Sequence, residues 1–255
     1  MLYLTRMVAF TETLLLSAVM GLSIYLSLPL VLSKNLSHRR TTLLNAVAIG
    51  ILVFLIGDVF LDAAGSLYNG SLYNYGSSPV YDLIFTVSTA MGFFALFIAG
   101  QRRKATMTPT YLAFIIALGI AFQNLTEGLL FGSVSAGIGI TGAALVVLVG
   151  FVLQNTTEGF PIASPFLGST EGKGGVIAGA LFVGGLPTIL GGAVGFYYNT
   201  TTFDLIFYGL AVGTMLYVIL PMLRNLLGVP DSGRLGVAYA GVFLGFILGF
   251  VVNLL

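Results

Sequence analysis

The chain has 255 residues, of which 57% are hydrophobic and only 7% are charged. Ten Lys/Arg and nine Asp/Glu cannot cover a soluble surface of this size, because a typical globular protein carries about 25% charged residues. The net charge of +1, with its scattered basic residues, excludes an electrostatic footprint for nucleic acid. Composition therefore predicts an all-α integral membrane protein with a single domain over residues 1–255.

The residue types that are missing exclude several kinds of site. The chain has no cysteine, which excludes disulfides, iron–sulfur clusters and thiolate zinc sites. Its one histidine, His38, lies beside Arg39 and Arg40, so a multi-histidine metal site or a histidine-based catalytic triad cannot be built. We therefore expect no enzyme activity and no bound cofactor.

A membrane-spanning helix needs roughly 20 mostly apolar residues. Eight stretches of the sequence meet this requirement, joined by short connections that leave no room for an extramembrane domain. They are Val8–Leu32, Leu43–Ala64, Val80–Gly100, Tyr111–Phe131, Ile140–Phe166, Val176–Tyr197, Phe203–Leu223 and Leu235–Val252. The first stretch is too long for a signal-peptide core and is expected to stay in the protein.

The basic residues predict the orientation of these spans. Nine of the ten Lys and Arg residues follow the first, third, fifth or seventh span, and only Arg6 lies on the other side. The positive-inside rule makes the side with nine basic residues cytoplasmic. Both termini are then outside, and the cell membrane is the expected location.

Five carboxylates lie within the predicted spans, namely Glu12, Asp58, Asp62, Glu127 and Glu158. An acid at the centre of a spanning helix costs about 2.5–3.5 kcal/mol on insertion scales, and no Lys or Arg lies at a matching depth. Each carboxylate must be protonated, hydrated in a cavity or paired with a cation. All three conditions favour a transport pathway over a purely structural role.

The fourth and fifth spans carry a repeated hexapeptide. It reads QNLTEG at residues 123–128 and QNTTEG at 154–159, identical at five of six positions and 31 residues apart. Within each copy Gln, Asn and Glu share one helical stripe. If the stripes face each other, they form an oxygen cage for a cation from two carboxylates and four amides. The alternative is a polar zipper, in which the amides bond across the two helices. The candidate metal ligands are Gln123, Asn124, Glu127, Gln154, Asn155 and Glu158.

On these residues the chain resembles the ZIP (Zrt/Irt-like) family of divalent metal-ion transporters. That family has eight helices with both termini outside, a His-Asn-x-Pro-Glu-Gly motif on the fourth helix and a related motif on the fifth. The resemblance implies transport of zinc, iron or manganese toward the cytoplasm, with the six motif residues at the transport site. It also implies an inverted repeat, in which spans 1–3 and 6–8 surround spans 4–5, and a homodimer.

The sequence departs from the family pattern at three kinds of position. Gln123 and Gln154 stand where the motif has histidine, and threonine replaces the proline before each Glu. Thr188 stands where the sixth helix of the family often has an acid, so we expect one oxygen-only site rather than two metals. Since imidazole suits zinc, while carboxylate and carbonyl oxygens suit manganese, the substitutions favour a harder cation. A scaffold that has lost transport is the alternative.

Asp58 and Asp62 lie one helical turn apart in the outer half of the second span. They are possible secondary site residues, together with Thr188, and they predict an acidic vestibule that concentrates cations. The alternative for Asp62 is a hydrated helix end. Gly241, Gly245 and Gly249 form a small-residue stripe on the last span, for which we expect packing within the bundle.

Two other function classes compete with transport. An intramembrane enzyme could use the carboxylate pair, but the chain has no Gly-x-Gly-Asp string and no histidine-containing metal motif. A non-transporting metal-binding or sensor protein could use the same scaffold. Metal retained by the purified protein without uptake into vesicles would favour this last class.

Overall fold

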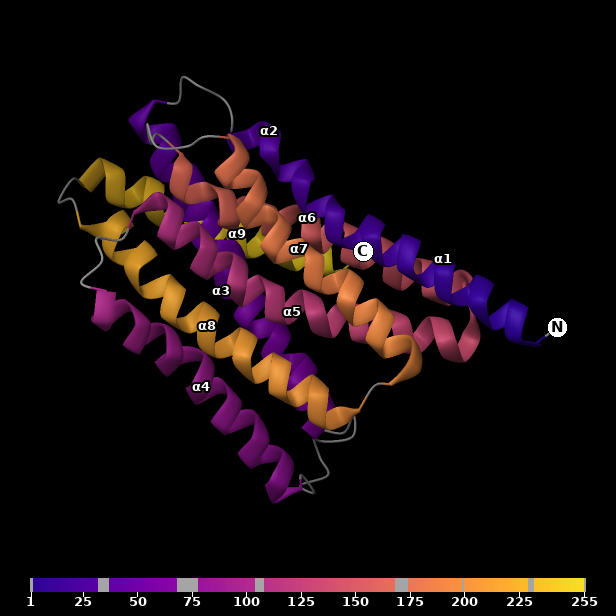
Figure 1. Cartoon of the computed structure of the whole chain (residues 1–255). Coiled ribbons are helices and arrows are strands. Elements are labelled where there is room, and N and C mark those ends of the chain that lie inside the picture. The colour runs from indigo at the N-terminus through magenta and orange to yellow at the C-terminus, as the bar shows by residue number, and fades with distance from the viewer. Residues whose placement is uncertain are drawn as a thin grey trace.

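The computed structural model describes residues 2–31, 37–67, 78–103, 108–167, 174–198, 200–228 and 232–254. All regular secondary structure in these ranges is helical, and Figure 1 shows the helices gathered into one bundle. The helices are α1 (Leu2–Leu22), η1 (Ser23–Ser27), α2 (Leu28–Val31), α3 (His38–Leu67), α4 (Pro79–Arg103), α5 (Pro109–Ile138), α6 (Gly142–Ala163), η2 (Ser164–Phe166), α7 (Gly174–Tyr197), α8 (Thr201–Leu227) and α9 (Ser232–Asn253).

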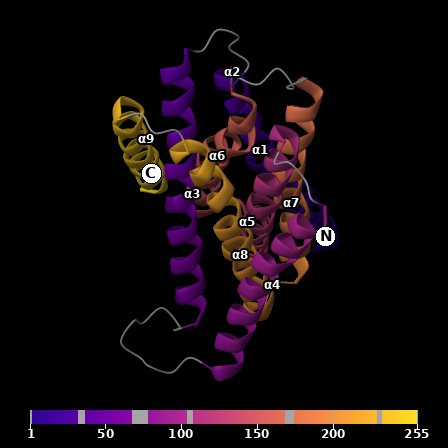
Figure 2. The same cartoon turned by 90° about the vertical axis from the view of Figure 1, so that its left-hand side faces the viewer.

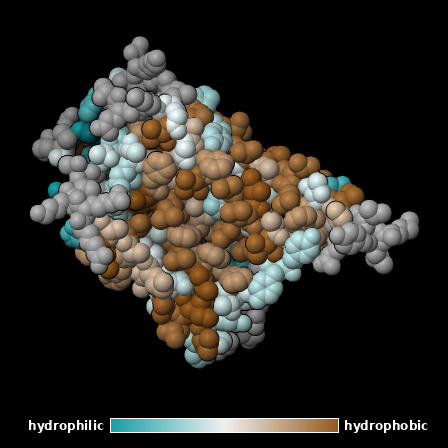
Figure 3. Space-filling view, in the orientation of Figure 1, coloured by the Kyte–Doolittle hydropathy of each residue, from teal (hydrophilic) through white to brown (hydrophobic). Residues whose placement is uncertain are grey.

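Eight helical segments within these ranges are long and apolar enough to cross a membrane. Each overlaps one predicted span, so the prediction of an all-helical chain with eight helices able to span a membrane is confirmed, and these helices suggest a multi-pass membrane protein. Both α3 and α5 contain 30 residues and extend beyond their predicted spans. Figure 3 shows mostly apolar side chains across the middle of the visible face, while hydrophilic ones gather toward the ends.

The first span is not one regular helix. It runs through α1, a 3₁₀ segment (η1) and the short α2. The hydroxyls of Ser23 and Ser27 donate to the carbonyls of Met20 and Ile24, three residues back, at 2.6 and 2.8 Å. Such bonds compete with the helix ladder, and Pro29 supplies no amide to it. The span therefore tightens before it reaches the end of the bundle.

Three pairs of helices pack most extensively, namely α5 with α7, α3 with α9 and α4 with α8. In each pair the two helices run in the same direction and approach through glycines. Gly128 of α5, for example, lies directly on the Thr188 carbonyl of α7. Because a glycine has no side chain, it lets two backbones come into contact. Figure 2 shows α5 near the middle of the bundle and α9 at its edge.

The glycine stripe of the last span is part of this packing. Gly241 lies against Ala46, and Gly245 against the Val47 carbonyl of α3. One turn later Gly249 contacts the Phe54 ring. The expectation that this stripe packs within the bundle is therefore confirmed.

The described basic residues of the connections gather at one end of the bundle. Arg39 and Arg40 lie in the first turn of α3, Arg224 in the last turn of α8 and Arg234 near the start of α9. Lys34, Lys104 and Lys173 lie outside the described residues. We refer to this end, which contains the starts of α3, α5 and α9, as the basic end.

Candidate metal centre

The two hexapeptides lie on α5 and α6, and most of their polar side chains are fully buried. Asn124, Asn155 and Glu158 each have 0% exposure, and Glu127 has 6%. Burying a carboxylate or an amide is unfavourable unless it has a partner. The partners of these side chains therefore decide what the site can do.

Glu127 joins the two motifs. Its Oε1 accepts a hydrogen bond from Gln123 Nε2 at 3.2 Å, one turn back on α5. Its Oε2 accepts one from Asn155 Nδ2 of α6, also at 3.2 Å. Glu127 also interacts electrostatically with Glu158. The predicted stripes thus face each other, and part of the polar zipper is present.

The zipper leaves several buried oxygens unpaired. In the hexapeptides and at Thr188, six buried side-chain oxygens have no hydrogen-bond partner among the described residues: Gln123 Oε1, Asn124 Oδ1, Asn155 Oδ1, Glu158 Oε1, Glu158 Oε2 and Thr188 Oγ1. An unsatisfied buried polar group costs about 1–3 kcal/mol, and more if it is charged. With Glu158 ionised, five of these six are acceptors only. The cluster thus has more acceptors than donors, which suits a cation.

Glu158 is the least satisfied of these side chains. Its carboxylate interacts with the amides of Asn124 and Gln154, yet neither oxygen accepts a hydrogen bond. Gln154 donates instead to Asp58 Oδ2 at 3.4 Å. The two motifs therefore differ, since Gln123 bonds its own glutamate while Gln154 bonds an aspartate on α3.

Asp58 and Asp62 have different surroundings. Asp58 is half-buried, and besides Gln154 it accepts a hydrogen bond from Asn253 Nδ2 at 2.7 Å. Asp62, one turn further along α3, is exposed. Asp58 thus belongs to the polar network of the hexapeptides, whereas Asp62 lies on the surface beyond it.

The α7 side of the cluster uses both backbone and side chain. Asn124 Nδ2 donates to the Gly184 carbonyl at 3.0 Å, which holds the start of the α5 motif against α7. Thr188, one turn further on, is fully buried and its hydroxyl has no partner. Thr188 therefore holds a buried hydroxyl oxygen without a hydrogen-bond partner among the described residues.

The threonines that directly precede Glu127 and Glu158 behave alike. Thr126 Oγ1 donates to the Gln123 carbonyl at 2.6 Å, and Thr157 Oγ1 to the Gln154 carbonyl at 2.7 Å. Each hydroxyl is occupied by its own helix. Pro161 lies inside α6 and supplies no amide to the Thr157 carbonyl.

Two participants were missed in the sequence. The residue pattern does not predict that the Gly184 carbonyl takes part. The only local signal is the nearby Pro187, which interrupts the backbone hydrogen bonds of the helix. Asn253 is an isolated amide in the last turn of an apolar helix, and an unpaired amide there was a usable signal.

Carboxylates alone do not make this site. Among the described residues, no three His, Cys, Asp or Glu side chains come together as a metal-ligand group. Any ion held here needs the amide, hydroxyl or carbonyl oxygens as well, and such hard oxygen ligands suit magnesium, calcium and manganese.

No protein-family model matches this chain, and no curated protein matches it.

Proposed function

We propose that this protein is a ZIP-like transporter of divalent metal cations. The observation that carries the proposal is the buried cluster of the two hexapeptides, in which amides of α5 and α6 bond Glu127 while both oxygens of Glu158 and the side-chain oxygens of three amides have no hydrogen-bond partner. Intramembrane carboxylates are costly and mark ion pathways. A divalent cation supplies the charge that this cluster lacks.

The ligand set favours a hard cation. The glutamates supply the charge, and the unpaired oxygens of Gln123, Asn124 and Asn155 complete the shell. Thr188 can add one more oxygen, and Asp58 lies beside the site through Gln154. With no imidazole or thiolate, manganese fits better than zinc within the zinc, iron and manganese class.

The proposed architecture is an inverted repeat, in which α1–α4 and α7–α9 surround α5 and α6. Gly21 of α1 lies on the carbonyl of Gly185, and Gly185 of α7 lies on the carbonyl of Gly21. A reciprocal contact of this kind is what a two-fold axis generates. The carbonyls three residues further along α7 and the first span are contacted in the same way. Gly128 of α5 packs on the carbonyl of Thr188, and Gly159 of α6 packs on that of Ile24.

The outer helices support the same axis. The pairs α3 with α9 and α8 with α4 repeat one contact pattern. In each pair, a glycine of one helix packs on a backbone carbonyl of the other helix, and a glycine three residues after that carbonyl makes the return contact. The contacts are Gly50 on Val242 and Gly245 on Val47 in the first pair, and Gly213 on Thr89 and Gly92 on Leu210 in the second. Rocking of these outer helices around α5 and α6 would expose the site to alternate sides.

The direction of transport follows from orientation. The positive-inside rule makes the basic end cytoplasmic and both termini outside, and Asp58 and Asp62 then lie on the outer half of α3. Cations are attracted from outside and released to the cytoplasm across the cell membrane. A homodimer, implied by the resemblance, stays a prediction that the size of the purified protein in detergent can test.

The decisive experiment is metal uptake by proteoliposomes, with Mn²⁺, Fe²⁺, Co²⁺, Zn²⁺ and Cd²⁺ offered in turn. Glu127→Gln and Glu158→Gln keep the side-chain shape and remove the charge, so each should abolish uptake. Glu12→Gln is the matched control, since Glu12 is an exposed acid on α1 outside the cluster.

Three outcomes separate the function classes. Loss of uptake in both cluster variants, but not in Glu12→Gln, supports transport through this site. Metal bound by the wild-type protein without uptake points instead to a metal-binding or sensor protein. Undiminished uptake in both cluster variants refutes the proposed site.

A further inference from the structure

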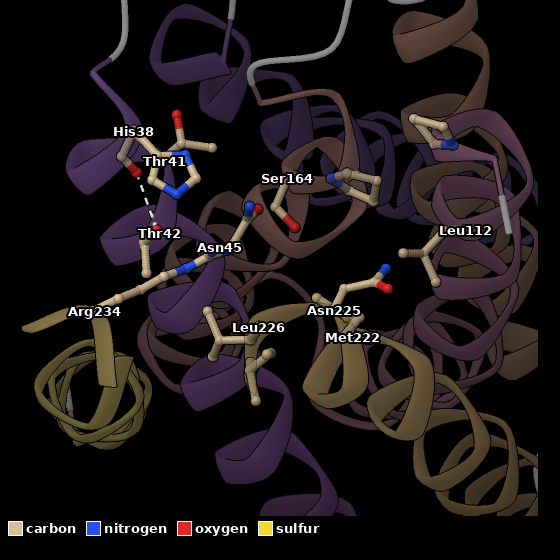
Figure 4. A pocket seen from close by; sticks show the side chains of 13 residues that line it. His38, Thr41, Thr42, Asn45, Leu112, Ser164, Met222, Asn225, Leu226 and Arg234 are labelled. Carbon is tan, nitrogen blue, oxygen red and sulfur yellow. Dashed lines mark hydrogen bonds between the residues drawn. The ribbon is translucent and has the colours of Figure 1, made fainter. Parts of the chain in front are cut away.

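A cavity of about 150 Å³ opens at the basic end, away from the hexapeptides. It lies between α3, α5, η2, α8 and α9. Among its lining residues are His38, Asn45, Ser164, Asn225 and Arg234. Figure 4 shows the Arg234 side chain reaching from α9 across the cavity toward Asn45 of α3.

The cavity is suited to an anion. None of its described lining residues is acidic, while Arg234 and His38 can both carry positive charge. His38 and Pro109 are the first residues of α3 and α5, so two helix N-termini with their positive dipole ends point here. Arg234 Nε is buried and has no hydrogen-bond partner among the described residues.

The basic character extends outward from this cavity. A second hollow of about 340 Å³ shares His38, Thr42 and Arg234 with it and adds Arg39 at the junction of α3 and α9. Arg234 thus stands between an internal cavity and an open surface.

An apolar groove of about 450 Å³ adjoins the cavity, and Leu226 lines both. The groove lies between the end of α8, the first half of α9 and the middle of α3. All of its lining residues are apolar or aromatic: Val53, Leu223, Leu226, Leu227, Ala238, Tyr239, Val242, Phe243 and Phe246. It therefore suits a hydrocarbon chain and no polar solute.

The two features have the spacing of one lipid molecule. From Arg234 to Phe246 the α9 helix rises roughly 18 Å, at about 1.5 Å per residue. One leaflet contributes about 15 Å of hydrocarbon. A headgroup at Arg234 would thus place its acyl chain along the groove toward the middle of the bilayer.

We propose that an anionic phospholipid binds here, with its phosphate against Arg234 and His38 and an acyl chain in the groove between α8 and α9. Basic pockets between spanning helices are a known solution for such headgroups. The bound lipid joins α3, α8 and α9 at the basic end. The site is independent of the proposed transport site, since the two share no residue.

The test measures lipid binding to the purified full-length protein by native mass spectrometry, with phosphatidylglycerol and phosphatidylcholine of equal chain length. Wild type should bind phosphatidylglycerol about tenfold more tightly, because the choline cation of phosphatidylcholine offsets its phosphate charge, while phosphatidylglycerol keeps a net negative charge for the basic side chains to attract. Arg234→Gln should remove this preference. Arg40→Gln is the matched control, because Arg40 is exposed at the same end but lines none of the three hollows.

A second variant and a competitor test the acyl chain. Val53→Trp fills the groove from its α3 side, where Val53 is 39% exposed, and should weaken binding of both lipids about tenfold or more. Inorganic phosphate should compete only weakly. The proposal is overturned if wild type binds the two lipids equally, or if Arg234→Gln and Arg40→Gln have equal effects. It is also overturned if phosphate competes fully and Val53→Trp has no effect.

Discussion

At the scale of single residues, Glu127 and Glu158 differ although their hexapeptides are nearly identical. Both oxygens of Glu127 accept amide hydrogen bonds, whereas Glu158 accepts none. The difference arises because Gln154 turns to Asp58 of α3. Glu158 therefore has more free oxygen for a cation, and Glu127 is the more firmly positioned of the two.

The glutamines in the motifs should determine which metal is preferred. Gln123→His combined with Gln154→His introduces two imidazoles, which suit zinc better than amides do. We expect the ratio of zinc to manganese uptake to rise on the order of tenfold, measured with both metals in competition. Gln101→His, on the exposed end of α4, is the control. An unchanged ratio would show that ligand type does not set selectivity here.

The two aspartates of α3 should also separate in experiment. The Asp58 carboxylate accepts hydrogen bonds from the Gln154 and Asn253 amides, and Asp58→Asn replaces it with an uncharged amide. The substitution therefore removes a charge-assisted hydrogen bond of about 1.5–3 kcal/mol. Uptake at limiting metal should fall about tenfold. Asp62→Asn changes an exposed side chain and should lower uptake less than twofold, through weaker attraction of cations alone. Equal effects would mean that Asp58 acts only as a surface charge.

At the scale of helices, glycine contacts set the depth at which the motifs meet. Gly128 and Gly159 occupy the same place in the two hexapeptides, and each lies on a carbonyl of a neighbouring span. These contacts bring α5 to α7 and α6 to η1. The polar stripes of α5 and α6 are then left facing each other, and Asn155 of α6 bonds Glu127 of α5.

Alanine at these glycines should separate the helices. Gly128→Ala and Gly159→Ala each place a methyl group against backbone that cannot give way, and overpacking typically costs about 1–3 kcal/mol. We expect both to lower the thermal unfolding midpoint in detergent. Gly150→Ala, also within α6, meets nothing within 4 Å and should be neutral or slightly stabilising. Similar midpoints for all three would contradict the packing described for α5 and α6.

At the scale of the whole molecule, the charged residues are distributed unevenly along the long axis of the bundle. The described basic residues of the connections gather at the basic end, and the hexapeptides lie deeper in the bundle between the two ends. A cation would thus be drawn toward acids on the side away from the arginines. This distribution suits one-way attraction of cations from the side of the termini.

The orientation can be measured directly, because the natural chain has no cysteine. In intact cells a membrane-impermeant maleimide should label Tyr198→Cys, at the end away from the basic loops, and should not label Arg40→Cys. Both positions are exposed, so permeabilisation should make both reactive. The reverse pattern would place the basic end outside and reverse the proposed direction of transport.

The sequence by itself determined the membrane class, the eight spans and the repeated hexapeptide, because composition, length and helical spacing are local properties of the chain. It also predicted that the α5 and α6 stripes could meet. Only the tertiary structure decided that Asn155 bonds Glu127, that Gln154 bonds Asp58, and that Asn253 completes this network. The physical reason is that these contacts depend on how each helix is rotated and on which helices lie beside it. Backbone contacts at glycine set both, and the spacing of residues along the sequence does not predict them.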